Sequence, residues 1–180
     1  MSPSAGVVRT PTVAEPVTLE GRFVRLEPLT MAHVAGLLAA AAGPQETYGF
    51  TLVPQGLAET RAYVEAALGE QEARRALPFA IVDRATGQVV GSTRFFNIEC
   101  WPWPAGNVNQ RGVERPDVVE IGWTWLAARA QRTPINSEAK LLMLAHAFDR
   151  WRVHRVSLMT DARNLRSREA IMRLDRKSVV

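Results

Sequence analysis

The amino-acid sequence predicts an α+β (α/β) fold in which helices flank a mixed, mostly antiparallel sheet. Segments whose apolar residues alternate with a period of two are interspersed with segments whose apolar residues recur at spacings of three and four, as strands and amphipathic helices require. These segments follow the order strand, two helices, three strands, helix, strand, helix. With 180 residues, of which 47% are hydrophobic, the chain has the length of one domain with a substantial core.

The N-terminal part is expected to hold a flexible tail, a strand and a helix. Residues 1–17 contain small residues and prolines, and a single domain is expected over residues 18–180. Residues 21–29 alternate like a strand. Thr30 suits the N-cap of a following helix, and Gly43 suits its end.

A second helix and a hairpin follow. Apolar spacing predicts a helix from residue 57 to about residue 75. Two alternating segments, residues 78–83 and 89–96, flank a short linker in which Gly87 can adopt a positive φ, so they are expected to pair as antiparallel strands. Residues 100–117 show little periodicity, and this long loop either walls the acceptor side of a site or is a variable surface insertion.

The clearest strand and the best-bounded helix lie further along the chain. Residues 118–126 form an apolar run rich in β-branched and aromatic residues, in which Glu120 is the only ionisable group. A buried central strand with one carboxylate is therefore expected. Thr133 suits the N-cap and Pro134 the first position of a helix whose apolar residues continue to Trp151.

The start of this helix is a candidate phosphate site. The first turn of a helix presents backbone amides that have no intrahelical partner, together with the positive end of the helix dipole, and both favour a phosphate or pyrophosphate. Arg132, which precedes the helix, could add a charge-assisted hydrogen bond.

A last strand and helix complete a pattern that resembles a known family. Residues 155–160 alternate like a strand, and an Arg-rich helix is expected over residues 165–174. The whole block resembles the GCN5-related N-acetyltransferases, in particular the branch of the ribosomal-protein N-terminal alanine acetyltransferases. The matching stretches are Glu120 to Trp123 (EIGW), Ser137 to Ala139 (SEA, where the family has TEA at the helix start), Asn164 to Ser167 (N-x-x-S) and, more weakly, residues 19–29.

The resemblance implies an N-acetyltransferase that uses acetyl-CoA as co-substrate and needs no metal. The acceptor is then a primary amine, on a protein N-terminus or a small molecule, that attacks the thioester directly. The family normally continues into two more strands after the last helix, whereas here residues 175–180 end the chain, so the domain is expected to be C-terminally truncated. A homodimer that covers the open sheet edge at residues 155–160 is one consequence.

Three positions depart from the family's pattern. Pro134 stands at the usual glycine of the loop and has no N–H to give a phosphate, and Asn136 stands at a usual small residue. Ile171 stands where many relatives carry a tyrosine that protonates the departing thiolate. A degenerate domain that binds a CoA thioester or a partner without catalysis is therefore the alternative to an active enzyme.

The candidate catalytic residues are Glu120 and Ser167. Free amines are mostly protonated at neutral pH, so transfer requires a base, and Glu120 is the candidate unless it points away and pairs with an arginine. Ser167 is the candidate acid or thiolate partner, with an ordinary first-turn helix residue as the alternative. The resemblance implies three groups of cofactor-binding residues: Trp125, Leu126 and Ala127, whose backbone would bind the oxyanion; Gln131, Arg132, Thr133, Ile135, Asn136 and Ser137 around the pyrophosphate; and Asn164 at the pantetheine arm, unless it only caps a helix.

Composition and residue spacing argue against several other classes of protein. The net charge of +4 arises mostly from arginine, and the arginine-rich stretch 163–176 has no interleaved aromatic residues, so nucleic acid is not an expected partner. His33, His146 and His154 lack metal-ligand spacing. Cys100 is the only cysteine, which fits a cytoplasmic location, and neither an export signal nor a membrane segment is indicated.

Overall fold

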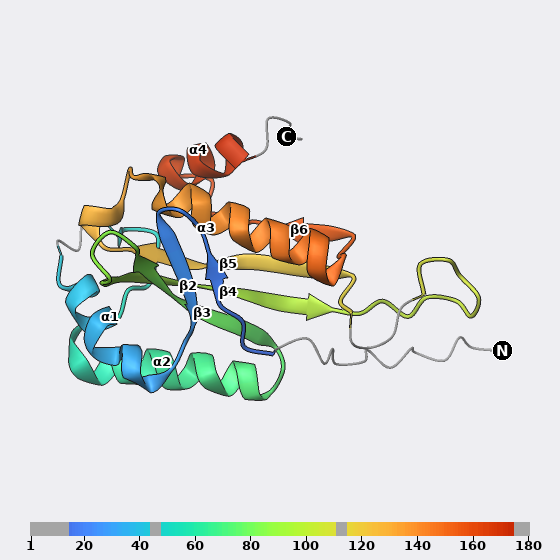
Figure 1. The fold of residues 1–180 in the computed structure, drawn as a ribbon, viewed down its shortest axis with the longest axis horizontal. Coiled ribbons are helices and arrows are strands. Elements are labelled where there is room, and N and C mark those ends of the chain that lie inside the picture. The colour runs from blue at the N-terminus through green and yellow to red at the C-terminus, as the bar shows by residue number, and fades with distance from the viewer. Residues whose placement is uncertain (1–14, 44–47, 111–114, 175–180) are drawn as a thin grey trace.

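The computed structural model describes residues 15–43, 48–110 and 115–174, and these residues form a single mixed sheet with helices on both of its faces (Figure 1). The strands are β1 (Leu19–Glu20), β2 (Val24–Pro28), β3 (Ala76–Asp83), β4 (Val89–Glu99), β5 (Val118–Leu126) and β6 (Arg155–Ser157). The helices are α1 (Val34–Ala41), α2 (Gly56–Glu72), α3 (Pro134–Ala145) and α4 (Leu165–Leu174). The strands pair in chain order, antiparallel throughout except for the parallel pair β5 and β6.

The order of the elements confirms the predicted α+β fold, with small differences at its ends. Of the strand expected over residues 21–29, residues 24–28 form β2. Residues 21–23 form the turn of a hairpin with β1, in which Gly21 N donates to Val24 O (2.9 Å). The strand β6 ends at Ser157, earlier than the alternation of residues 155–160 predicts. Most of the predicted tail and all of residues 175–180 lie outside the described residues.

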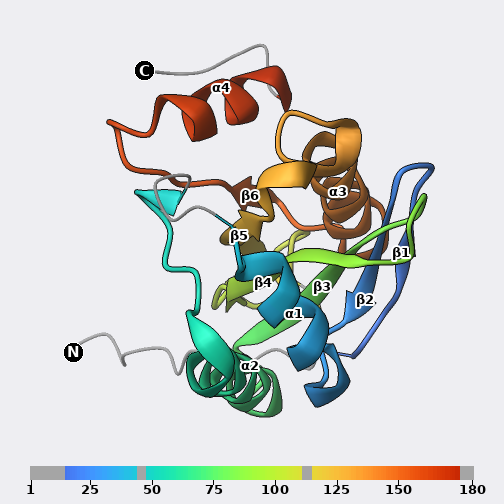
Figure 2. The ribbon, with the colours of Figure 1, turned by 90° about the vertical axis from the view of Figure 1, so that its left-hand side faces the viewer.

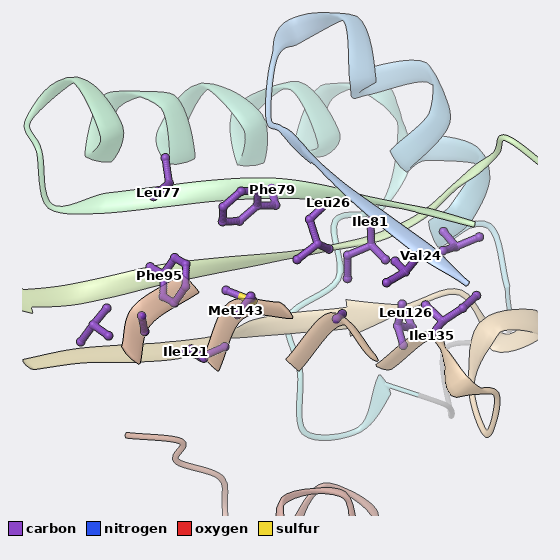
Figure 3. Packing of buried hydrophobic residues seen from close by; sticks show 14 of the residues in the cluster. Val24, Leu26, Leu77, Phe79, Ile81, Phe95, Ile121, Leu126, Ile135 and Met143 are labelled. Carbon is purple, nitrogen blue, oxygen red and sulfur yellow. The ribbon is translucent and has the colours of Figure 1, made fainter. Parts of the chain in front are cut away.

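The sheet separates two layers of helices, each with its own core. In Figures 1 and 2, α1 and α2 cover one face and α3 covers the other. The core on the α3 side includes Phe79, Phe95 and Met143, which are fully buried (Figure 3). The core on the α1 and α2 side forms around Leu37 and Val64. Burial on both faces explains why β3 reads as a continuous apolar run.

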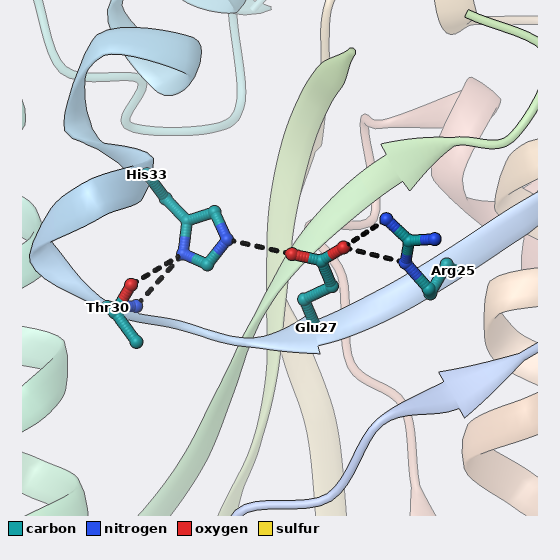
Figure 4. A network of polar contacts seen from close by, with 4 residues as sticks. All are labelled: Arg25, Glu27, Thr30 and His33. Carbon is teal, nitrogen blue, oxygen red and sulfur yellow. Dashed lines mark hydrogen bonds and ion pairs between the residues drawn. The ribbon is translucent and has the colours of Figure 1, made fainter. Parts of the chain in front are cut away.

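The junction between β2 and α1 is fixed by a chain of polar contacts (Figure 4). Thr30 N donates to Nδ1 of His33 (3.0 Å), so this ring nitrogen is the acceptor and Nε2 donates to Glu27 (3.1 Å). On its other side, Glu27 accepts from Nε of Arg25 (2.6 Å). The hydrogen bond from His33 and then that from Arg25 hold the pKa of Glu27 below its usual value, against the opposing effect of burial.

The helix α3 begins where the sequence predicts. Thr133 is the N-cap, and its Oγ1 accepts from Ile135 N (3.4 Å), while Pro134 occupies the first helical position. After Ala145 the helix widens into one π-helical turn that ends at Trp151, which is buried against the sheet. Trp151 therefore anchors the far end of this helical segment on the sheet.

Candidate active site

A cleft opens where β5 and β6 part. The two strands pair only from Val118 and Arg155 to Glu120 and Ser157, and β5 then continues to Leu126 while the chain after β6 turns away towards α4. The resulting cleft has a volume of about 800 Å³ and is lined by the free half of β5, the start of α3, the segment after β6 and one side of α4. This volume is in the range of a site for a small molecule or cofactor.

A bulge in β5 shapes the floor of the cleft. The register with β4 passes from Ser92 opposite Trp125 to Arg94 opposite Gly122, so two residues of β5 face Thr93 alone. One of them, Trp123, has a φ of 51°, a left-handed conformation that the bulge imposes. The bulge shifts the alternation of the strand, and the next side chain, that of Thr124, consequently points towards α3.

Glu120 lies at the inner end of the cleft. Its side chain is nearly buried, with 7% exposure, and Oε2 accepts a hydrogen bond from Asn97 Nδ2 (2.9 Å). Its neighbours Val119 and Ile121 belong to the core on the α3 side, so Glu120 points to the opposite face. No ion pair between Glu120 and an arginine is present among the described residues. The carboxylate is thus available to a group that enters the cleft.

The start of α3 forms the other end of the cleft. Arg132, Thr133, Asn136 and Ser137 line it, as does Gln131, whose Nε2 donates to Leu126 O (3.0 Å). Arg132 has a φ of 60° and forms the sharp bend into the helix.

Ile135 is placed elsewhere. Its amide donates to the Thr133 cap, and its buried side chain borders a separate, small concavity beside Arg22 and Arg84. Of the six residues predicted to bind the pyrophosphate, all except Ile135 therefore line the cleft.

The three residues expected to bind the oxyanion also differ in the direction of their backbone groups. Ala127 N donates to Val90 O (2.7 Å), so this amide faces β4 and lies outside the cleft. The carbonyl of Trp125 also faces β4, since a Cβ added to Gly91 would lie 2.1 Å from Trp125 O. Successive amides of a strand point in opposite directions, so the amide of Leu126 faces the open side. Leu126 is the residue of the three whose N–H can reach a ligand there.

Asn164 and Ser167 both line the cleft from the start of α4. Asn164 Oδ1 accepts from Ser167 N (3.1 Å), which is the N-cap arrangement considered as its structural alternative. The cap uses the Oδ1 atom of the Asn164 amide. Ile171, one turn further along α4, presents an apolar side chain to the same cleft.

Lys140 is a cleft residue that the sequence patterns did not single out. Its side chain is 6% exposed, and its Nζ donates to Thr124 Oγ1 (2.5 Å) and to Thr93 Oγ1 (3.3 Å). Burial lowers the pKa of Lys140 to about 7. The signal in the sequence was a charged residue on the helix face that also carries Ala139 and Met143, which belong to the core.

The wall near Glu120 is aromatic. Phe96, which lies opposite Glu120 in the pairing of β4 with β5, and Trp123 line this part of the cleft, while Tyr48 and Phe50 line it elsewhere. The guanidinium of Arg94 lies over the Trp123 ring, 4.8 Å from its centre, and forms a cation–π contact with it. A molecule that enters this part of the cleft meets a largely apolar surface.

The described residues contain no group of three or more His, Cys, Asp or Glu side chains that could hold a metal ion. Within the same residues, no helix is both long enough and apolar enough to cross a membrane.

Comparison with known proteins identifies the family. The family model of the acetyltransferase (GNAT) domain matches residues 24–177, so the chain belongs to the GNAT acetyltransferases, which confirms the resemblance inferred from the sequence motifs. A search of curated proteins found no significant match.

Solved structures agree on the fold. A GCN5-related N-acetyltransferase from Brucella melitensis has a TM-score of 0.70 and 29% identity; the match covers 88% of this chain but only 66% of the Brucella chain, slightly under two thirds. RimL, a ribosomal L7/L12 alpha-N-protein acetyltransferase, has a TM-score of 0.68 and 18% identity, with 88% and 79% coverage. The microcin C7 self-immunity acetyltransferase MccE, solved with acetyl-CoA and AMP, has a TM-score of 0.68 and 15% identity, with 86% and 79% coverage. The last two show the fold alone.

Proposed function

We propose that this chain transfers an acetyl group from acetyl-CoA to a primary amine, on a protein N-terminus or a small molecule. The observation that carries the proposal is the cleft between β5 and β6, which has the start of α3 at one end and Glu120 at the other. Family membership supports acetyl transfer in general. The primary amine is the acceptor that the family resemblance implies, and the roles of the residues are argued from the geometry of the cleft.

The phosphate end of the site is the start of α3. The amide of Asn136, at the third helical position, belongs to the first turn, where the helix dipole and N–H groups without an intrahelical partner favour a pyrophosphate. Ser137 lines the same end of the cleft. Arg132 lines the same end and supplies a positive charge. Pro134 removes one donor, but it holds the first helical position without strain. These groups can hold the pyrophosphate of a CoA thioester.

The reacting end lies deeper, between Leu126 and Glu120. The N–H of Leu126 would stabilise the oxyanion of the tetrahedral intermediate, and Glu120 would remove the proton from the attacking ammonium group, directly or through a water molecule. Asn97 orients the Glu120 carboxylate through its hydrogen bond. Ser167 or another group must return a proton to the thiolate, because Ile171 cannot do so.

The first test is thermal stability of the chain against increasing acetyl-CoA. A ligand present at 100 times its dissociation constant stabilises the folded state by about 2.7 kcal/mol, so a specific site produces a rise in Tm that depends on concentration. A rise would justify a screen of amines with detection of free CoA thiol. No shift at millimolar acetyl-CoA would contradict the proposal.

A second candidate function is supported by two residues. Pro134 at the start of α3 and Ile171 in the cleft both remove groups that favour catalysis, which fits a domain that binds a CoA thioester without turnover. Stabilisation by acetyl-CoA combined with no thiol release for any amine would favour this alternative.

A further inference from the structure

Lys140 is an unusual residue in this chain. The sequence contains only two lysines, Lys140 and Lys177, whereas its other basic side chains are arginines or histidines. Lys177 lies outside the described residues. Lys140, the lysine that the structure describes, is buried at the wall of the cleft proposed for acetyl-CoA.

The surroundings of Lys140 favour the neutral amine. Its Nζ contacts two hydroxyl groups, those of Thr93 and Thr124, and it forms no ion pair with any carboxylate among the described residues. A buried ammonium group without a counter-ion is costly, and desolvation lowers the pKa of Lys140 to about 7. Near neutral pH a large fraction of this amine is unprotonated, which is the nucleophilic form.

The position of Lys140 along the cleft matches the position proposed above for the thioester. The helix α3 begins near the Leu126 end of β5 and runs back along it, so Lys140, six residues after Pro134, lies about 9 Å further into the cleft than the phosphate end. Its contact with Thr124 places it beside the bulge, between Leu126 and Glu120 in the order of the strand. Glu120 is on the opposite face of β5, so the two groups approach the thioester position from different sides.

We propose that the Nζ amine of Lys140 is a second acyl acceptor inside the cleft, which takes the acetyl group from bound acetyl-CoA when no external amine is present. The proposal rests on the function proposed above, since it requires acetyl-CoA in this cleft. The lone pair of Nζ attacks the thioester carbonyl carbon and forms a C–N bond, the C–S bond breaks, and CoA leaves as the thiolate. The proton lost by the nitrogen passes to the thiolate, for which the Thr124 hydroxyl is a suitable relay, and the products are acetyl-lysine and free CoA.

Acetylation at this site changes the cleft. The product is a neutral amide that is larger than the amine and cannot regain a positive charge. It occupies space at the wall where the pantetheine arm and thioester would lie. The modified protein should bind acetyl-CoA more weakly than the unmodified protein, so the reaction limits turnover when the acceptor is scarce.

The experiment is incubation of the full chain with acetyl-CoA, followed by intact-mass measurement and peptide mapping. We expect a gain of one acetyl group at Lys140, at a rate that saturates with acetyl-CoA, falls when free CoA competes, and exceeds that at Lys177 by at least about tenfold because the bound thioester is held near the amine. Lys140→Arg, whose guanidinium stays protonated, should remain unmodified at this position. The matched control Lys177→Arg should be acetylated like the wild type.

Acetyl-CoA binding, followed in the same samples through Tm, separates the outcomes. Stabilisation by acetyl-CoA with Lys140 unmodified would overturn this proposal and leave the proposed function intact. Modification confined to Lys177 or the N-terminal amine would also overturn it. Absence of stabilisation together with absence of acetylation would overturn both. These readings come from the wild-type chain and do not depend on the folding of any variant.

Discussion

Glu138 Oε2 lies 2.6 Å from the backbone nitrogen of Phe23, and this contact ties the first turns of α3 to the tip of the β1–β2 hairpin. The same carboxylate accepts from the amides of Arg22 (2.8 Å) and Val24 (2.8 Å). The side chain thus satisfies three backbone donors of a turn that lies more than 100 residues away in the sequence. It also fixes α3, and with it the phosphate end of the cleft, against the sheet.

Replacing Glu138 by glutamine should destabilise the fold. The amide oxygen can accept only part of these hydrogen bonds and carries no charge, and hydrogen bonds to charged groups contribute about 1.5–3 kcal/mol each, so a loss of about 2 kcal/mol is expected. Urea unfolding of Glu138→Gln beside Glu72→Gln, an exposed glutamate at the end of α2, measures this difference. Equal stability of the two variants would show that the contact is dispensable.

The stabilisation by Glu138 should also depend on pH. Burial alone would raise the pKa of this carboxyl group, but hydrogen bonds from Phe23, Arg22 and Val24 outweigh that effect and the pKa lies below the usual 4.5. A lowered pKa in the folded state means that the contribution is complete above about pH 4.5 and is lost as the pH falls through the folded-state pKa. The difference between wild type and Glu138→Gln should therefore shrink in acid, as measured by unfolding from pH 7 downwards.

Lys140→Met should stabilise the protein at neutral pH. The pKa of Lys140 falls from 10.5 to about 7 on folding, which corresponds to a cost of up to about 5 kcal/mol wherever both states are protonated. Methionine has a similar length and is apolar, and the hydroxyls of Thr93 and Thr124 already lie 2.7 Å apart and can bond to each other. A rise in Tm is expected, with Lys177→Met as the matched control.

The pH dependence of this gain has a definite sign. Since the folded-state pKa is lowered, the unfolded chain binds more protons than the folded chain between pH 7 and 10.5, so the stability of the wild type increases with pH over that range. The advantage of Lys140→Met should be largest below pH 7 and decline towards pH 10.5. A gain that is constant with pH, or no gain, would mean that Lys140 is better solvated than its burial indicates.

Arg132→Ala should weaken acetyl-CoA binding by about tenfold, as expected for loss of one charge-assisted hydrogen bond at a partly exposed site. A truncated acetyl-pantetheine thioester has no pyrophosphate, so its affinity should change little. Arg129→Ala is the matched control, because Arg129 precedes the same bend but donates to Gln88 Oε1 (3.2 Å) instead of lining the cleft. Titration calorimetry with both ligands decides the point, and equal weakening of the two would place Arg132 away from the pyrophosphate.

Local signals were sufficient to predict most elements of this fold. Thr133 and Pro134 mark the start of α3 because capping and a fixed φ act within a few residues. The alternation on either side of Gly87 likewise marks the β3–β4 hairpin, in which Gly87 has a φ of 69°. These features depend on neighbours in the sequence.

The features that were not predicted depend on distant neighbours. The contact of Glu138 with Phe23 joins residues 115 positions apart, and nothing near Glu138 indicates it. At the bulge the positive φ falls on Trp123 and not on the neighbouring Gly122, because the register with β4 imposes it. The hydrogen bond between Lys140 and Thr124 follows from that bulge, which turns Thr124 towards α3. The amide directions of Trp125 to Ala127 also follow from strand pairing, which the family motif does not specify.

Glu120→Gln should lower turnover by about 10² to 10⁴ without weakening acetyl-CoA, since a general base typically contributes a factor of this size. Glutamine preserves the volume of the side chain, and its oxygen can still accept the hydrogen bond from Asn97, so the wall of the cleft should keep its shape. Amide nitrogen and oxygen cannot remove a proton from an ammonium group, so the defect should appear in kcat while the Tm shift with acetyl-CoA stays as in the wild type. Glu169→Gln, which removes a carboxylate from the α4 side of the same cleft, is the matched control and should retain turnover. Thiol release with an amine found by screening measures both variants, and an unchanged rate for Glu120→Gln would assign the proton transfer to another group or to water.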